Sequence, residues 1–265
     1  PLLYTFRERE ETLDMFEMVG GARMNPSYFR IGGLAGDLPE GFVEKVRAFC
    51  EDLPSRIEGY ERLLTENKIW ISRTKDVGII SAEDGIELGL SGPCLRGSGV
   101  EWDLRKANPY SSYDHFDFDI PTGKAGDTYD RYLVRMEEMR QSNRIILQTL
   151  DKLPSGEINA YNPKVISPLK EKVQENIESL IMHFHLMTEG FNVPKGEAYA
   201  SVESSKGELG FYVVSDGTSK PYRIKIRTPS FVNMESLGTM VEGSMMSDIV
   251  SVIGSIDICL GEVDR

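Results

Sequence analysis

Residues 20–33, with the sequence GGARMNPSYFRIGG, place two arginines in a segment rich in glycine and aromatic residues. The glycines at its ends and the proline within it predict turns and not a helix. Its apolar residues are Met24, Tyr28, Phe29 and Ile31. We therefore expect the loop to pack down, which takes Arg23 and Arg30 partly out of water and costs free energy unless each finds an acceptor. The two arginines either bind an anionic group or brace the loop against carboxylates and carbonyls.

A second candidate is Asp257, the single charge in the apolar run IGSIDICL. A carboxylate in such a run needs a cationic partner or has a raised pKa, and the nearest basic residue in the sequence is Arg265. A structural ion pair and a proton-handling role both remain open. Cys259 in the same run is expected to be a small buried hydrophobe. Lys206, in the turn SSKGE, is expected to be solvated.

Metal-ligating patterns are weak in this chain. His183 and His185 are two residues apart on an expected helix, so they point in different directions and cannot share one ion. The three cysteines, Cys50, Cys94 and Cys259, are far apart and form no CxxC motif. This spacing predicts neither a disulfide framework nor a cluster or zinc site, and it is typical of a reducing compartment.

The composition is that of an ordinary globular protein. The chain has 265 residues, of which 40% are hydrophobic and 27% charged, and a net charge of −12. This acidic balance argues against binding to nucleic acid and to anionic membrane surfaces. No apolar run approaches the roughly 18–20 residues that span a bilayer. Because the chain begins with Pro1 and not with methionine, we expect a fragment or a processed product, whose missing motifs lie upstream.

Periodicity predicts the elements that must position these residues. Helical spacing of apolar residues marks the segments 6–19, 37–66, 81–90, 127–150, 169–188 and 244–255. Pro54 should kink or split the second helix, and Ser81 should cap the third, with Asp84 three residues on. Two long helices, 127–150 and 169–188, are expected to form the antiparallel backbone of a helical bundle. The last helix is almost uniformly apolar, which predicts a buried core helix.

Extended structure is predicted in fewer places. Residues 68–72 are expected to be a short extended piece and residues 115–120, HFDFDI, a strand. Segments 197–203, 210–214 and 221–227 alternate or are β-branched, with turn signals between them, which predicts a three-stranded antiparallel sheet. The expected fold is therefore mainly α with a small antiparallel β-sheet (α+β), as a single domain over 1–265 with a β insertion at about 197–228.

Long motifs along the whole chain resemble one family. They are YTFRERE, GARMxxxYFRIGG, LSGPCLRGSGVEWDLRK, GDTYDRYLVRMEEMRQS, SSKGELGFYVVSDGTSKPYRIKIRTPSF and GSIDICLGEVDR. They resemble the quinone-site subunit of NADH–quinone oxidoreductase, respiratory complex I, which is related to the large subunit of nickel–iron hydrogenases. The resemblance implies a subunit without a redox centre of its own. A partner iron–sulfur subunit carries the terminal 4Fe-4S cluster, other peripheral-arm and membrane-arm subunits complete the enzyme, and FMN and NADH are bound in partner subunits.

The resemblance also assigns residues. It places Arg23 and Arg30 near the partner's terminal cluster, and Lys206, in a matching turn motif, at the quinone cavity or close to the cluster. In the family, the C-terminal segment lines or braces the quinone cavity; its matching residues here are Asp257, Cys259 and Arg265. Glu101, Asp103 and Arg105 match a family motif to which no role is assigned. The implied location is the cytoplasmic face of a bacterial plasma membrane or the matrix face of the inner mitochondrial membrane.

The chain departs from the family pattern at three points. Asn25 stands where many members have a histidine that couples the potential of the cluster to pH. Position 259 is more often valine, and the histidine and tyrosine of the quinone head belong to the region before Pro1. The implied function is a subunit that forms part of the quinone-reduction site of NADH–quinone oxidoreductase. The alternatives are a catalytically silent scaffold and a subunit of the ion-translocating hydrogenase branch, which the missing cysteine pairs disfavour.

Overall fold

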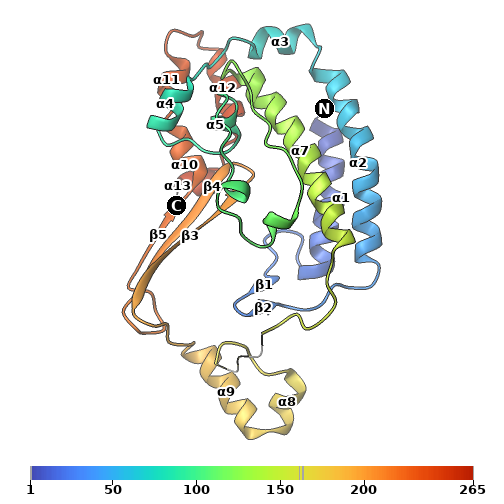
Figure 1. Ribbon diagram of the computed structural model, residues 1–265, viewed down its shortest axis with the longest axis vertical. Coiled ribbons are helices and arrows are strands. Elements are labelled where there is room, and N and C mark those ends of the chain that lie inside the picture. Colours follow the sequence, from blue (N-terminus) through green and yellow to red (C-terminus); the bar gives the residue numbers. More distant parts are fainter. Residues whose placement is uncertain (1, 161, 163, 265) are drawn as a thin grey trace. The chain divides into compact units, whose positions relative to one another are not determined.

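The computed structural model describes residues 2–160, 162 and 164–264. Contacts group them into two units, of which unit 1 holds residues up to 51, 152–197 and 213–223, and unit 2 holds 52–151, 198–212 and the residues from 224. The chain combines helices with two small antiparallel sheets (Figure 1), which confirms the predicted α+β class. The single-domain assignment stays a prediction.

Unit 1 is built mainly from helices and one short hairpin. Its elements are α1 (Leu2–Gly20), β1 (Phe29–Arg30), β2 (Gly33–Leu34), the first part of α2 (Phe42–Leu64), α8 (Lys170–Glu175) and α9 (Ile177–Thr188). Strands β1 and β2 pair antiparallel, with Phe29 opposite Leu34. Gly33 lies so close to Ile158 that a Cβ would come within 2.3 Å of its carbonyl oxygen, so the hairpin requires glycine there.

Unit 2 holds the remaining helices. Its elements are the rest of α2, α3 (Lys68–Thr74), α4 (Ala82–Glu87), α5 (Pro93–Arg96), α6 (Leu104–Ala107), the 3₁₀ turn η1 (Tyr113–His115), α7 (Thr128–Asp151), α10 (Pro229–Met234), α11 (Leu237–Val241), α12 (Asp248–Ile256) and α13 (Leu260–Asp264). The strands β3 (Gly196–Ser204), β4 (Gly207–Ser215) and β5 (Arg223–Arg227) form a sheet in the order β3-β4-β5, which confirms the predicted three strands.

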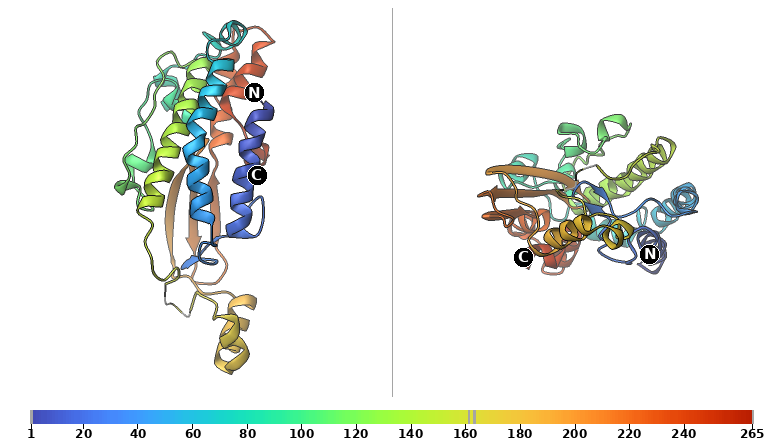
Figure 2. Two further views of the ribbon diagram at one scale, coloured as in Figure 1. Left: turned by 90° about the vertical axis from the view of Figure 1, so that its right-hand side faces the viewer. Right: turned by 90° about the horizontal axis from the view of Figure 1, so that it is seen from below.

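Two hydrophobic clusters hold unit 2 together. The larger joins the segments on either side of α4 to α5, α11 and α12 through Ile80, Leu90, Cys94, Leu95, Met240, Val252 and Ile256. The smaller joins the later part of α2 to α7 through Ile57, Tyr60 and Met136. Figure 2 shows these two helices running side by side. Helix α2 continues through Pro54 and is not split there, so of the two expected outcomes only a kink stays a prediction.

Three predicted elements differ from the structure because side chains supply hydrogen bonds that periodicity does not reveal. Residues 68–72 are helical, since Asn67 caps α3 by accepting hydrogen bonds from the amides of Ile69 and Trp70. The segment 169–188 is two helices, because Asn176 is extended and its side chain caps α9 by accepting from the amide of Glu178. The long unbroken helix predicted there is therefore wrong.

Residues 115–120 form no strand. The amides of Asp117 and Asp119 donate instead to the side chains of Gln148 and Gln141 on α7, at 2.9 and 3.0 Å. The alternation in the sequence therefore reports one-sided burial, with Phe118 buried, and not pairing with another strand. The buried helix predicted at 244–255 is also shorter and half-exposed, because α12 buries Val252 and Ile256 but leaves Val250 76% exposed.

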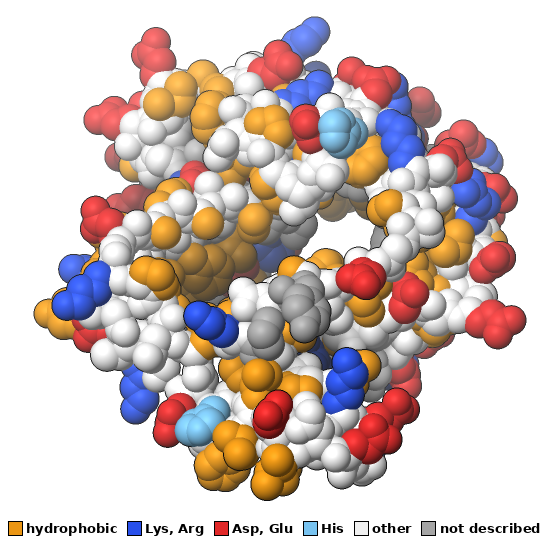
Figure 3. Space-filling model, turned by 60° about the horizontal axis from the view of Figure 1, so that its bottom comes forward, with side chains coloured by type: hydrophobic (Ala, Val, Ile, Leu, Met, Phe, Trp, Pro, Cys, Tyr) orange, Lys and Arg blue, Asp and Glu red, His pale blue; other side chains and the backbone are white. Residues whose placement is uncertain are grey.

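The loop 20–33 is not packed down, contrary to expectation. Met24, Phe29 and Ile31 are exposed, and Tyr28 alone of the four apolar residues is buried. Exposed apolar residues also gather on the helix pair of unit 1 (Figure 3). They are Leu169, Ile177, Leu180, Ile181, Phe184 and Met187. None of the helices in the described part of the chain is long and apolar enough to cross a membrane.

The N-terminus of α4 allows a direct test of the predicted cap. The hydroxyl of Ser81 accepts a hydrogen bond from the amide of Asp84 at 3.0 Å and donates to its carboxylate at 2.6 Å. We expect Ser81→Ala to lower the free energy of unfolding by about 1 kcal/mol in urea denaturation. Ser142→Ala on the exposed face of α7 is the control and should be neutral or slightly stabilising. Equal effects of the two substitutions would contradict the cap.

Candidate functional site

Two of the candidate residues from distant parts of the sequence form an ion pair in unit 2. The Nζ atom of Lys206 lies 2.9 Å from Oδ2 of Asp257. The side chains are 21% and 47% exposed, so the pair is shielded on one side and open to solvent on the other. The sequence offered Arg265 as the nearest partner of Asp257, but that residue lies outside the described residues. The sequence analysis expected Lys206 to be simply solvated, but the structure pairs it with Asp257.

The backbone fixes Asp257 at the end of a helix. It is the C-cap of α12, with φ 57° and ψ 55° in the left-handed region. Among residues with a Cβ, aspartate and asparagine enter this region most readily. The chain turns sharply there and leads to α13.

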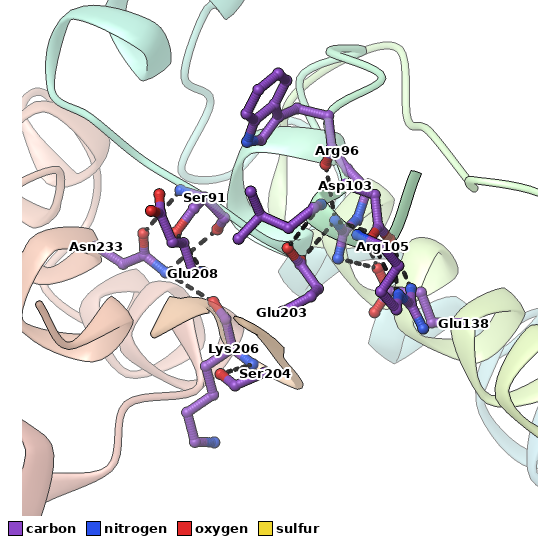
Figure 4. Close-up of polar contacts among 12 residues, drawn as sticks. Ser91, Arg96, Asp103, Arg105, Glu138, Glu203, Ser204, Lys206, Glu208 and Asn233 are labelled. Carbon is purple, nitrogen blue, oxygen red and sulfur yellow. Dashed lines mark hydrogen bonds and ion pairs between the residues drawn. The ribbon is translucent and has the colours of Figure 1, made fainter. Parts of the chain in front are cut away.

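Close approach of two glycines holds the turn that carries Lys206. Gly92 and Gly207 lie against each other, and a Cβ on Gly92 would meet the Cα of Gly207 and the carbonyl oxygen of Lys206, both at 2.6 Å. Asn233 donates to that carbonyl from Nδ2 at 3.1 Å, and the hydroxyl of Ser91 accepts from the amide of Glu208 at 3.0 Å (Figure 4). The sequence analysis missed these residues, although the glycines beside Ser91 and Lys206 were a visible signal.

The C-terminal helix is attached beside Asp257 by polar contacts. The hydroxyl of Ser230 donates to the carboxylate of Glu262 and accepts from the amide of Cys259 at 3.2 Å. Thr228 donates to the carbonyl oxygen of Glu262 at 2.9 Å. Cys259 itself is exposed, so its prediction as a buried hydrophobe is wrong. Ser230 and Glu262 are further residues that the sequence analysis did not single out.

A buried cluster of five charged side chains lies in the same unit (Figure 4). Its centre is the guanidinium of Arg96 on α5, whose side chain is 2% exposed. It contacts Glu138 of α7 at 2.7 Å and Glu203 of β3 at 2.9 Å. Asp103 lies 3.5 Å from Arg96 and binds Arg105 at 2.6 Å. Of the family motif noted above, Asp103 and Arg105 thus belong to this cluster, whereas Glu101 is exposed.

The cluster contains three carboxylates and two guanidinium groups. Burial raises the pKa of Glu138 above its ordinary value, although the charge of Arg96 opposes the shift. Burial likewise raises the pKa of Glu203, and Arg96 again opposes it. Burial also acts to raise the pKa of Asp103, but the hydrogen bond and the charge of Arg105 outweigh it, so this pKa is lowered. Of the three carboxylates, the two glutamates are therefore the ones whose pKa is raised.

The candidates Arg23, Asn25 and Arg30 lie in unit 1 and are all exposed. Arg23 pairs with Glu10 and, at 3.8 Å, with Asp14, as the bracing interpretation predicts. Arg30 has no ion pair within the described residues. Asn25 has φ 53°, a left-handed conformation that asparagine tolerates well.

The histidines of α9 have separate neighbours. Nδ1 of His183 lies 2.9 Å from the hydroxyl of Ser167, and Nδ1 of His185 lies 3.4 Å from the carboxylate of Glu189. Within residues 2–160, 162 and 164–264, no three histidine, cysteine, aspartate or glutamate residues are grouped so that they could hold a metal ion.

The raised pKa of Glu203 predicts a pH dependence of stability. A carboxyl group whose pKa is higher in the folded state contributes stability below its unfolded pKa, roughly 4.3, and loses it as pH rises through the folded value. Glu203 should therefore raise the free energy of unfolding of the unsubstituted protein, here called the parent, as the pH falls from 7 to 5. Glu203→Gln removes the titrating group, so its stability should rise less over this range in urea denaturation at each pH.

Glu101→Gln is the matched control, since Glu101 is an exposed glutamate of the neighbouring motif. Its pH profile should parallel that of the parent. A Glu203→Gln profile that also parallels the parent would show that Glu203 does not bind a proton more tightly in the folded state.

Comparison with known proteins identifies the family. The family model described as respiratory-chain NADH dehydrogenase, 49 Kd subunit, matches residues 1–265. A protein named as a subunit of NADH-quinone oxidoreductase, from Geotalea uraniireducens, is 54% identical over 263 residues, which are 99% of this chain and 67% of the relative. Proteins of the same name from Geobacter sulfurreducens and Orientia tsutsugamushi are 53% and 49% identical, over 99% and 100% of this chain and 67% of each relative.

The chain thus spans about two thirds of the length of these relatives, at about half identity throughout. The match agrees with the motifs that suggested the family from sequence. The chain belongs to the family of the 49 Kd subunit of respiratory-chain NADH dehydrogenase.

Proposed function

We propose that this chain acts as a peripheral-arm subunit of a proton-translocating NADH–quinone oxidoreductase and forms part of its quinone-reduction site. The observation that carries the proposal is the ion pair of Lys206 and Asp257, which joins two motifs assigned to that site by the family resemblance. The proposed partners are the iron–sulfur subunit with the terminal 4Fe-4S cluster and further subunits of both arms. The quinone lies at the interface, and NADH and FMN are bound by partner subunits.

The pair suits a site where a quinone gains protons as well as electrons. Asp257 is 47% exposed, so its carboxylate can exchange a proton with solvent or with a bound molecule. The ammonium group of Lys206 pairs with this carboxylate at 2.9 Å and fixes its position. The contact of Gly92 with Gly207 and the hydrogen bond from Asn233 hold the turn of Lys206 in place. They thereby keep its ammonium group beside the carboxylate of Asp257. Cys259 and Ser230 anchor the chain just after Asp257.

Arg23 and Arg30 have different parts in the proposal. A cluster that gains an electron becomes more negative, and a nearby guanidinium stabilises this state and raises the midpoint potential. Glu10 and Asp14 already balance Arg23, whereas Arg30 lacks a carboxylate partner in the described part of the chain. Arg30 is therefore the arginine that can face the partner's cluster with its full charge. Asn25 cannot titrate between pH 6 and 8, so it does not couple the potential to pH.

Substitution of Asp257 tests the proposed site. We expect Asp257→Asn, in the assembled complex, to lower the rate of NADH-driven quinone reduction roughly 100-fold, the lower range for a side chain that transfers protons. Electron transfer from NADH to an artificial acceptor that takes electrons from the flavin should remain unchanged. Lys206→Met should lower quinone reduction as well, because it leaves the carboxylate without its cation.

Lys220→Met is the matched control, since Lys220 lies in the turn between β4 and β5 and is exposed. It should leave quinone reduction unchanged. Normal quinone reduction in an assembled Asp257→Asn complex would remove the pair from the proposed site.

The two arginines give a second test, with Arg23 as the internal control. Arg30→Met should lower the midpoint potential of the partner's terminal cluster by tens of millivolts in a redox titration followed by electron paramagnetic resonance. Arg23→Met should shift the potential less, because the guanidinium of Arg23 is held against Glu10 and Asp14 of α1 and is not free to approach the cluster. Equal shifts, or none, would return both arginines to a bracing role.

A further inference from the structure

A cavity in unit 2 carries positive charge that the proposed function does not use. Its volume is about 420 Å³, and it lies between α3, α7 and α12. Its walls are formed by Trp70, Arg73, Thr74, Thr128, Tyr132, Arg135, Val250, Ser251, Gly254 and Ser255. Two of these residues are cationic and none is acidic, while the hydroxyl groups and the two aromatic rings supply hydrogen bonds and apolar surface.

Arg135 has hydrogen-bond donors without acceptors in this wall. Its Nη1 donates to the carbonyl oxygen of Arg131 at 3.4 Å, but Nε and Nη2 are buried and have no hydrogen-bond partner. These two nitrogens form one edge of the guanidinium, which is the edge that holds both oxygens of a carboxylate. The indole nitrogen of Trp70 in the same wall is also buried without a partner. A buried donor without an acceptor costs free energy, so the cavity favours a molecule that accepts these hydrogen bonds.

The carboxylates nearby are already engaged by other cations. Asp248 binds Arg73 at 2.6 Å, which neutralises that wall residue. Glu138, one turn along α7 from Arg135, is held by Arg96 at 2.7 Å. The charge of Arg135 is therefore not matched at hydrogen-bond distance by any carboxylate that the structure describes.

Arg131 adds a further positive charge behind the cavity. It is fully buried and donates to two carbonyl oxygens, of Gly126 and Gly78, and to the hydroxyls of Ser255 and Thr128. These acceptors are neutral, so its charge is not cancelled by an ion pair within the described residues. Ser255 and Thr128 also line the cavity, so the field of Arg131 reaches it through them.

We propose that this cavity binds a small organic carboxylate, held by the Nε–Nη2 edge of Arg135. Because these nitrogens are closed to solvent, binding requires a rotation of the Arg135 side chain that turns this edge into the cavity. The rings of Trp70 and Tyr132 and the side chain of Val250 then contact the apolar part of the ligand. A carboxylate fits better than phosphate, because a doubly charged and strongly hydrated ion loses more hydration free energy against these apolar walls.

Trp70 provides a reporter for the test. The chain has two tryptophans, so Trp102→Phe leaves Trp70 as the single fluorophore. In the full chain with this substitution, we expect sodium butyrate to change the fluorescence saturably at constant ionic strength. Sodium chloride should give no saturable change, and inorganic phosphate should bind more weakly than butyrate. Isothermal titration calorimetry of the unsubstituted chain should give the same dissociation constant.

Arg135→Met should weaken butyrate binding about tenfold or more, because it removes hydrogen bonds to a charged group. Arg135→Lys keeps the charge but lacks the paired donors, so its affinity for butyrate should lie between those of Arg135→Met and the parent. This variant tests the site even if the methionine variant fails to fold. Arg144→Met, on the same helix with Asp117 and Asp119 as partners, is the matched control and should bind like the parent. An absent response to butyrate, equal binding by Arg135→Lys and the parent, or tighter binding of phosphate would overturn the proposal.

Discussion

The burial of Arg96 is the constraint on which unit 2 depends. A guanidinium that is 2% exposed must be surrounded by acceptors, and these come from elements far apart in sequence: Glu138 on α7 and Glu203 on β3. The loop before α6 adds the carbonyl oxygen of Trp102 at 2.8 Å. Helix α5, this loop, α7 and β3 are thereby fixed around one side chain. Because the turn with Lys206 follows Glu203 by three residues, the same constraint orients the lysine toward Asp257.

The unit buries a second arginine in a different way. Arg96 is balanced by carboxylates, which act to raise its pKa against the effect of burial. Arg131 is surrounded by carbonyl and hydroxyl oxygens, and burial lowers its pKa. Carboxylates cancel the field of Arg96 within the cluster, whereas dipoles only reduce that of Arg131. Arg131 and Arg135 therefore place beside the cavity positive charge that no ion pair among the described residues cancels.

Local signals predicted much of the fold, and three of the exceptions share one physical cause. Apolar stripes indicated α1, α2 and α7, alternation indicated the sheet, and Ser81 was correctly expected to cap α4. These three errors arose where side-chain amides complete the backbone: Asn67 starts a helix, Asn176 divides one, and glutamines on α7 pair with residues 115–120. Lys206 and Asp257 were each singled out, but their pairing depends on the contact of Gly92 with Gly207, which no local pattern contains.

Among the carboxylates that could handle protons, Glu138 and Glu203 differ from Asp257 in their exposure to solvent. Glu138 and Glu203 have raised pKa values, but they are enclosed and bound to Arg96, so a proton that reaches them must pass through packed side chains. Asp257 has one open side and one cation, which allows exchange without rearrangement of the fold. The enclosed cluster is thus suited to holding the framework, and Asp257 to contact with a molecule outside it.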